Sequence, residues 1–92
     1  MTVWWSRHAE RDLLHIEKYL SLHSESVACR VVAHIITTAD GLRTLPRSGR
    51  TGTVKGTREK LTLPFPYVLI YEHHPRRGEI FIVRVYHMAQ NR

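Results

Sequence analysis

Polar side chains follow a strongly apolar run near the C-terminus. The run Glu79–His87 reads EIFIVRVYH; Arg84 interrupts its apolar residues, and Tyr86 and His87 close it. The ordinary pKa of histidine lies near neutrality and an arginine stabilises anions, so these residue types suit proton transfer and anion binding. We expect the run to be a strand that delivers these groups to a site. In the alternative interpretation, Arg84 reaches solvent along its apolar stem and His87 is an ordinary residue at a strand end.

Two consecutive strands are predicted to position these groups. Tyr67–His73 and Glu79–His87 are both rich in β-branched and aromatic residues, and a five-residue turn containing Pro75 and Gly78 joins them. The second run is apolar on both alternating faces, with Ile80 and Ile82 on one and Phe81, Val83 and Val85 on the other. A strand with two apolar faces is usually central in its sheet and covered on both sides.

Two amphipathic helices are predicted before these strands. Ser6 is a candidate N-cap for a helix Arg7–Leu22, and a second helix is expected over Glu25–Leu45, where Pro46 would stop it. Apolar residues recur at spacings of three and four on one face of each helix: Ala9, Leu13, Ile16 and Leu20, then Ala28, Val32, Ile35, Ala39 and Leu42. Because the connection is short, the helices should form an antiparallel hairpin.

The remaining elements complete an α+β domain over residues 1–92. Val3–Trp5 is a short strand candidate, Pro46–Gly56 is a basic, glycine-rich loop, and Thr57–Leu63 is a further strand. The order is therefore β-α-α-β-β-β, with the last three strands in an antiparallel meander and the first added at an edge. The helical hairpin would cover one face of the antiparallel β-sheet. The opposite face is expected to carry Arg58 and Lys60 with some of Tyr67, Tyr71, Arg84, Tyr86 and His87.

Positive charge is concentrated in the C-terminal half of the chain. The formal net charge is +6 at pH 7. Residues 1–45 contain five Lys or Arg and five Asp or Glu, whereas residues 46–92 contain nine and three, so the second half supplies the whole surplus. This asymmetry favours a nucleic acid or an acidic protein as partner, against the alternative of a merely soluble basic protein.

Several classes of protein do not fit the sequence. No apolar run is long enough to span a bilayer and no secretion signal is evident, so the cytoplasm is favoured and no membrane association is expected. The single Cys29 excludes an internal disulfide and is predicted to be a small core residue. The histidines at positions 8, 15, 23 and 34 have no repeated ligand spacing, so no metal site is expected. The basic loop has no Walker or dinucleotide-binding pattern, and no cofactor is expected.

Five stretches of the chain together carry a resemblance to a known family. They are Trp5–Leu13 with Ile16 and Tyr19, Pro46–Arg50, Gly56–Glu59, Pro66–Tyr71 and Arg84–Gln90. The set is specific, although no single motif is. The chain resembles the RelE/ParE superfamily of bacterial toxins from type II toxin–antitoxin modules. The resemblance implies a toxin that arrests growth and is neutralised by a cognate antitoxin in a hetero-oligomeric complex.

The resemblance leaves the target open. RelE-like members cleave mRNA in the ribosomal A site, whereas ParE-like members poison DNA gyrase and show no nuclease activity, and a shared fold does not decide between them. The Ala-Glu-Arg-Asp-Leu start, the long helical hairpin and the Val-Tyr-His ending are closer to the ParE-like branch, which favours gyrase. A third alternative is a binding module that regulates its own operon, but the sequence has no helix-turn-helix or ribbon signature.

For the nuclease alternative, the candidate catalytic residues are His87, Arg84 and Arg58. RNA cleavage by the 2′-hydroxyl needs a proton acceptor, positive charge at the scissile phosphate and a donor for the leaving oxygen. His87 would be the acid or base, and the arginines would stabilise the phosphate. Arg84 and His87 are an odd number of residues apart, so they meet only if the strand ends or bulges near Tyr86.

Further residues are expected to contact the target or the partner. The candidates are Lys55, Lys60, Arg50, Tyr71 and Tyr86, and either tyrosine would be able to stack on a base. The basic half of the chain also predicts an acidic antitoxin that is partly disordered when free. It would fold over the apolar groove beside the helical hairpin and over the exposed sheet edge.

Overall fold

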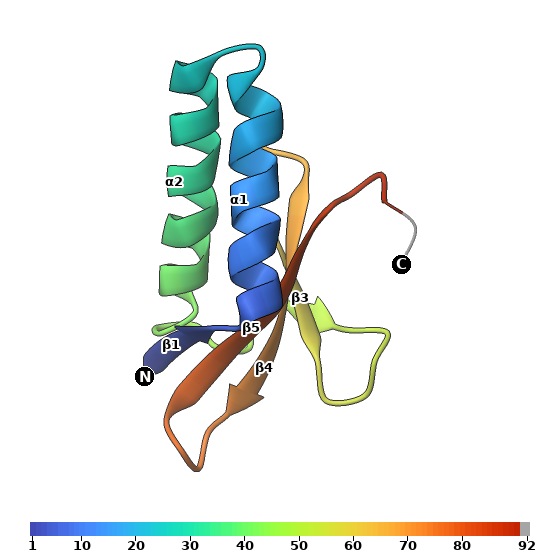
Figure 1. Ribbon diagram of the computed structural model, residues 1–92. Helices are drawn as coiled ribbons and strands as arrows, with labels where there is room; N and C mark the ends of the chain where they lie inside the picture. The colour runs from blue at the N-terminus through green and yellow to red at the C-terminus, as the bar shows by residue number, and fades with distance from the viewer. Residues whose placement is uncertain (91–92) are drawn as a thin grey trace.

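A helical hairpin stands against one face of a twisted sheet (Figure 1). The structure is a computed structural model, and it describes residues 1–90. In chain order the elements are β1 (Thr2–Trp5), α1 (Arg7–Ser21), α2 (Glu25–Gly41), β2 (Arg50–Thr51), β3 (Arg58–Leu61), β4 (Tyr67–His74) and β5 (Glu79–His87). The predicted α+β class and the hairpin on a sheet are confirmed. The two-residue strand β2 lies within the segment that the sequence predicts to be a loop.

Five strands form one sheet in the order β1-β5-β4-β3-β2. The strands β3, β4 and β5 pair antiparallel, as the predicted meander requires. The first strand adds at an edge, also as predicted, but it runs parallel to β5, so the sheet is mixed. Its last residue, Trp5, lies opposite Ile82. From Val83 onward, β5 has no neighbouring strand on its outer side within residues 1–90.

Serine side chains begin both helices. The Oγ atom of Ser6 accepts a hydrogen bond from the Ala9 N–H at 3.0 Å, and that of Ser24 accepts one from the Val27 N–H at 3.3 Å. The Ser6 hydroxyl also donates to the Val83 carbonyl oxygen at 2.7 Å. One residue therefore starts α1 and fixes its first turn to β5.

The second helix ends earlier than predicted. It stops at Gly41 instead of Leu45, and the chain then turns through Leu42. Glycine is a weak helix former, and a residue that precedes a proline, as Leu45 does, is disfavoured in the helical conformation. Two local effects therefore end the helix before Pro46.

A β-bulge in β5 changes which residues face the helices. Consecutive residues of β4 pair with Arg84 and Ile82, so Val83 between them is an additional residue. The bulge moves Val85 onto the face of Ile82, and both side chains are buried in the core. The prediction of strict alternation, with Val85 on the opposite face from Ile82, is therefore wrong.

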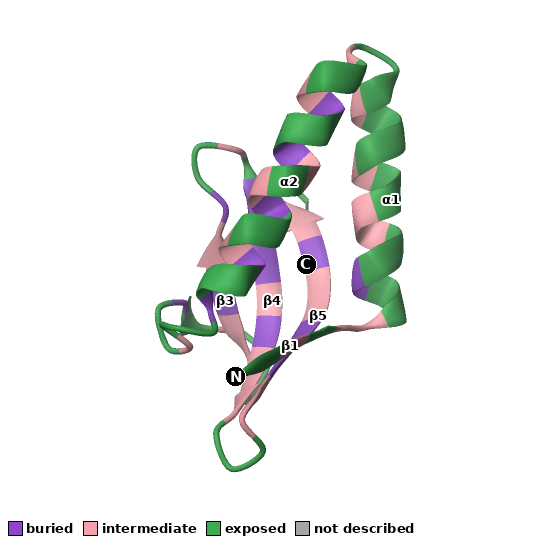
Figure 2. Ribbon diagram, turned by 90° about the vertical axis from the view of Figure 1, so that its left-hand side faces the viewer, coloured by how far each residue is buried: buried purple, intermediate pink, exposed green. Residues whose placement is uncertain are grey.

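The core lies between the hairpin and the helix-facing side of β4 and β5 (Figure 2). Its buried members are Ala9, Val31, Ile35, Ala39, Leu42, Tyr67, Leu69, Tyr71, Ile80, Ile82 and Val85. From α1 only Ala9 is fully buried, and the rest of the apolar stripe of this helix is half-buried against the core. The first helix therefore covers its side of the sheet incompletely.

Neither helix within residues 1–90 has the length and apolar character needed to cross a membrane. The thiol of Cys29 on α2 is exposed, so the prediction that it is a core residue is wrong.

Candidate functional site

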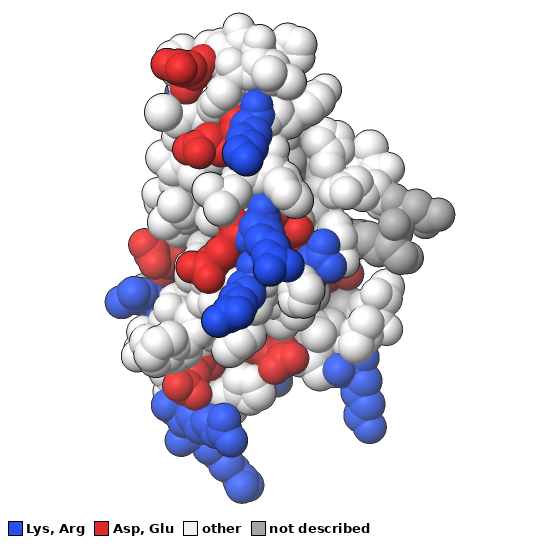
Figure 3. Space-filling view, viewed as in Figure 1, with Lys and Arg blue, Asp and Glu red and all other residues white. Residues whose placement is uncertain are grey.

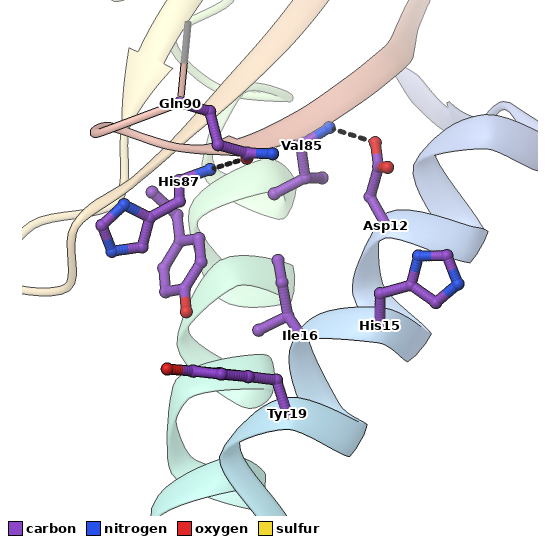
Figure 4. Close-up of a pocket in the computed structure, with 8 residues that line it drawn as sticks. Asp12, His15, Ile16, Tyr19, Val85, His87 and Gln90 are labelled. Atoms are coloured by element: carbon purple, nitrogen blue, oxygen red, sulfur yellow. Dashed lines mark hydrogen bonds between the residues drawn. The ribbon is translucent and has the colours of Figure 1, made fainter.

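An open groove separates α1 from the start of β4 and the end of β5 (Figure 4). Its volume is about 390 Å³. It is lined by Asp12, His15, Ile16, Tyr19, Tyr67, Val85, His87 and Gln90. The groove is a direct result of the incomplete cover that α1 provides, because the helix forms one wall and the sheet forms the other.

His87 closes one end of this groove, and a hydrogen bond to its ring selects one tautomer of the neutral form. Its Nδ1 atom accepts a hydrogen bond from the Ala89 N–H at 3.0 Å, so the neutral ring carries its proton on Nε2. The ring packs edge-on against Tyr67, with centroids 5.2 Å apart. Its own backbone N–H donates to Oε1 of Gln90 at 2.6 Å. His87 is therefore an ordered residue whose free ring position is a donor.

The neighbouring phenol of Tyr67 is part of the same wall. Burial raises the pKa of Tyr67, and the nearby Tyr19 raises it further. Both causes keep the hydroxyl protonated at neutral pH, so Tyr67 offers the groove a neutral polar group and an aromatic surface.

Arg84 does not join His87. By register it lies opposite Ile70, on the face away from the core, and its guanidinium packs over the Tyr86 ring at 4.8 Å from the centroid. Its Nε atom donates to Oδ2 of Asp12 at 2.8 Å, and this hydrogen bond is the main cause that raises the pKa of Arg84. The bulge at Val83 precedes both residues, so the odd offset still separates Arg84 from His87.

Arg58 and Lys60 lie on the helix-facing side of β3. Arg58 is opposite Tyr71 and Lys60 is opposite Leu69, and both partners are core residues. Arg58 donates from Nη1 to the Gly49 carbonyl oxygen at 2.8 Å. The prediction that Arg58 and Lys60 form a cationic face opposite the helices is therefore wrong, because the register turns both toward the hairpin.

Acidic groups also accompany the cations at the surface. Arg50 donates from Nε and Nη2 to Oε1 of Glu59 at 3.0 and 2.9 Å. On the face shown in Figure 3, acidic and basic groups are interspersed over the upper and middle parts, and basic groups project at the lower end. Lys55 is exposed in the loop before β3. The positive surplus of the second half is thus distributed over several surfaces.

The two tyrosines predicted to stack on a base differ in exposure. Tyr71 is fully buried; its hydroxyl donates to the Pro46 carbonyl oxygen at 2.7 Å and accepts from the Gly49 N–H at 3.1 Å. The prediction that Tyr71 contacts a target is therefore wrong, because the side chain anchors the loop after α2. Tyr86 is half-buried, and the Arg84 guanidinium packs over its ring.

The groove contains residues that the sequence alone does not single out. Asp12 and His15 flank the apolar stripe of α1 at Leu13 and Ile16, so they stand at the boundary between core and solvent. The position of a polar residue beside an apolar stripe is the signal in the sequence that could have identified these two residues. Many helices have such a residue, so the signal is not specific. Within residues 1–90, no group of three or more His, Cys, Asp or Glu side chains is placed to hold a metal ion.

Comparison with known families decides the class of protein. Residues 3–92 match the family described as the ParE toxin of the type II toxin–antitoxin system parDE. The chain belongs to this family. It is therefore a type II toxin of the RelE/ParE superfamily, as the resemblance implies.

Two individual relatives of this ParE-family chain carry names that describe them as toxins or putative toxins. It is 35% identical over 88 residues to Toxin RelE2 of Caulobacter vibrioides, covering 96% of each chain. It is 40% identical over 67 residues to Y4kP of Sinorhizobium fredii, covering 73% of this chain and 70% of that protein.

Solved structures show the same fold. A chain of the chromosomal ParDE toxin–antitoxin system from P. aeruginosa superposes with a TM-score of 0.82 at 26% identity, covering 95% of each chain. A chain of the RelBE2 toxin–antitoxin complex from Mycobacterium tuberculosis superposes with a TM-score of 0.69 at 25% identity, covering 97% of this chain and 92% of that one.

Proposed function

We propose that this ParE-family toxin arrests growth by poisoning DNA gyrase and does not cleave RNA. The observation that carries the proposal is the separation of the groups that cleavage would need. His87 belongs to the groove, whereas the Arg84 guanidinium is held by Asp12 and packs over the Tyr86 ring, and Arg58 is on β3 beside Gly49. An acid–base group and two cations are therefore not arranged around one phosphate.

The hydrogen bonding of His87 also argues against a general base. Its Nδ1 atom already accepts the Ala89 N–H, so Nε2 becomes a proton acceptor only if that hydrogen bond is broken. Arg84 is neutralised by the Asp12 carboxylate, which reduces its attraction for a phosphate.

The alternative is a ribosome-dependent mRNA endonuclease of the RelE type. The similarity to Toxin RelE2 over 96% of the chain favours it, and so does the Nε2–H of His87, which lies in an open groove as a proton donor for a leaving oxygen. In this alternative the ribosome would have to bring the scissile phosphate and further charges to His87.

The proposed partner is an acidic antitoxin that forms a hetero-oligomeric complex with this chain. Both structural relatives come from toxin–antitoxin systems, and the net charge of +6 complements an acidic segment. The outer edge of β5 is already hydrogen-bonded by the side chains of Ser6, Asp12 and Gln90. The groove is therefore a better docking surface for the antitoxin than that edge.

Two assays with purified toxin test the target. One follows supercoiling by gyrase and looks for trapped cleavage complexes, and the other looks for A-site cuts in ribosome-bound mRNA. We expect trapped gyrase complexes and intact mRNA. Cut mRNA with unaffected gyrase would reject the proposal in favour of the endonuclease.

The variant His87→Ala separates the two targets further. It should leave gyrase poisoning within about threefold of wild type, because no acid–base chemistry is required. If the chain is an endonuclease, the same variant should lose cutting by at least about 100-fold. His8→Ala is the matched control, since His8 is an exposed histidine on α1 that does not line the groove.

Antitoxin docking is tested at Tyr19, which lines the groove and is 63% exposed. Tyr19→Ala should weaken binding of the acidic partner by about tenfold or more, as removal of a buried interface aromatic does. Leu22→Ala is the control, because Leu22 is 80% exposed and does not line the groove. Equal affinities for both variants in calorimetric titrations would place the antitoxin elsewhere.

A further inference from the structure

A second hollow lies at the opposite end of β4 from the groove. It has a volume of about 420 Å³. Its lining comes from the loop after α2, from β2, from the loop before β3, and from the ends of β3 and β4: Arg47, Thr51, Gly56, Thr57, Arg58, His73 and Pro75. The groove meets β4 at its first residue, Tyr67, whereas this hollow meets it near its end, at His73.

The hollow contains positive charge that no carboxylate in the described part of the chain neutralises. Arg47 has no hydrogen bond or ion pair within residues 1–90, and Arg58 uses only Nη1, for the Gly49 carbonyl oxygen. The adjacent carboxylates, Glu59 and Glu72, alternate onto the other face of the sheet. There they bind Arg50 and His74.

One of the residues that line the hollow, His73, has an unsatisfied polar atom. The Nε2 atom of His73 is buried and has no hydrogen-bond partner within residues 1–90. Native structures contain few such atoms, and each calls for a ligand, a water or an ion that would satisfy it. Burial lowers the pKa of His73, and the neighbouring Arg47, Arg58 and His74 lower it further. Both arginines line the hollow together with His73.

We propose that this hollow, formed by Arg47, Arg58 and His73, binds a phosphate group. Two guanidinium groups and one imidazole approach from three separate elements, and a phosphate offers three oxygens to them where a planar carboxylate offers two. Gly56, with a φ of 86°, adds a turn without a side chain at the rim. The site lies outside the groove and goes beyond the proposed gyrase function, so neither proposal depends on the other.

Calorimetric titration of the purified toxin tests the site. The probes are inorganic phosphate, a nucleoside 5′-monophosphate and a dinucleoside monophosphate, each compared with chloride at equal ionic strength. In parallel, NMR follows the His73 ring, whose signal is assigned with His73→Gln. We expect each phosphate that binds to shift the His73 signal and chloride to leave it unchanged.

Arg47→Gln and Arg30→Gln form a matched pair of variants, because both arginines are exposed and each change removes one positive charge. Arg47→Gln should weaken phosphate binding by about tenfold, as loss of a charge-assisted hydrogen bond does, and Arg30→Gln by less than about twofold. Equal weakening in both variants, or equal effects of phosphate and chloride, would overturn the proposal.

The probes also identify the source of the phosphate. A preference for inorganic phosphate and the monoester supports the site as one for free phosphate or a nucleotide. If the dinucleoside monophosphate, which is a phosphodiester, binds as tightly as the other two probes, the result supports a site for a nucleic-acid backbone. The absence of binding by all three probes would reject the site, whatever the gyrase assay shows.

Discussion

Asp12 of α1 and Arg84 of β5 form a two-point ion pair, with 2.8 Å between Oδ2 and Nε and 3.1 Å between Oδ1 and Nη2. The same Oδ2 atom accepts the Val85 N–H at 2.9 Å. This contact lies directly after the bulge at Val83, where β5 has lost its neighbouring strand. One carboxylate therefore neutralises a strand cation and satisfies a backbone group that the sheet leaves unpaired.

Asp12→Ala should destabilise the fold by about 1–3 kcal/mol, because it leaves the Val85 N–H and the Arg84 guanidinium without their acceptor. Asp40→Ala is the control. The Asp40–Arg43 pair is 3.7 Å long and both side chains are more than half exposed, so its loss should cost about 0–1 kcal/mol. The free energies of unfolding from urea titrations give the comparison, and equal costs would show that the Asp12 contacts contribute nothing beyond a surface pair.

Tyr71→Phe should cost about 1–3 kcal/mol of unfolding free energy, although it removes a single oxygen atom. The change leaves the Pro46 carbonyl and the Gly49 N–H without their partner in a buried position. Tyr19→Phe, at a side chain that is 63% exposed, should change stability by less than about 0.5 kcal/mol. A Tyr71→Phe protein with an unchanged urea midpoint would show that water replaces the hydroxyl without cost.

Gly49→Ala should also destabilise the protein, by about 1–3 kcal/mol through overpacking. A Cβ atom at this position would lie 2.7 Å from the Tyr71 hydroxyl oxygen and 2.8 Å from the Glu59 carbonyl oxygen. At Gly41, by contrast, a Cβ would meet nothing within 4 Å, and the residue is helical. Gly41→Ala should therefore stabilise the fold by about 0.5–1 kcal/mol. Thermal unfolding should show a midpoint below that of wild type for Gly49→Ala and above it for Gly41→Ala.

The His73 ring should titrate below the ordinary histidine pKa of 6.5, because burial and neighbouring positive charges disfavour its protonated form. A lowered pKa in the folded state means that the neutral ring supports stability above pH 6.5. That contribution is lost as the pH falls through the lowered folded-state pKa. Arg47→Gln should move the NMR titration midpoint of His73 back toward 6.5. An unchanged midpoint would show that Arg47 does not influence the pKa of the His73 ring.

The elements of the fold could be predicted because their signals are local. The bounds of β5 and the Ser6 cap of α1 follow from short patterns, and the structure confirms them. The side to which Arg58 points could not be predicted, since it depends on pairing with Tyr71 across the sheet. The bulge at Val83 is equally nonlocal, and it reverses the inferred face of Val85.

The candidate site was predictable in composition but not in arrangement. His87 could be identified as a polar residue at the end of an apolar strand, and it does line the open groove. The partners of Arg84 and Tyr71 could not be identified, because Asp12 and Pro46 lie 72 and 25 residues away in the chain. Neither spacing leaves a pattern in a single sequence.

The parallel pairing of β1 with β5 has a consequence for synthesis on the ribosome. Ser6 caps α1 and also binds Val83, 77 residues further along the chain. A nascent chain that has not yet extended past β5 has no partner for its first strand and no anchor for its first helix, since long-range contacts form only when both ends are present. The toxin fold therefore assembles only after β5 has been synthesised, so an antitoxin that is already present can bind the toxin as it forms.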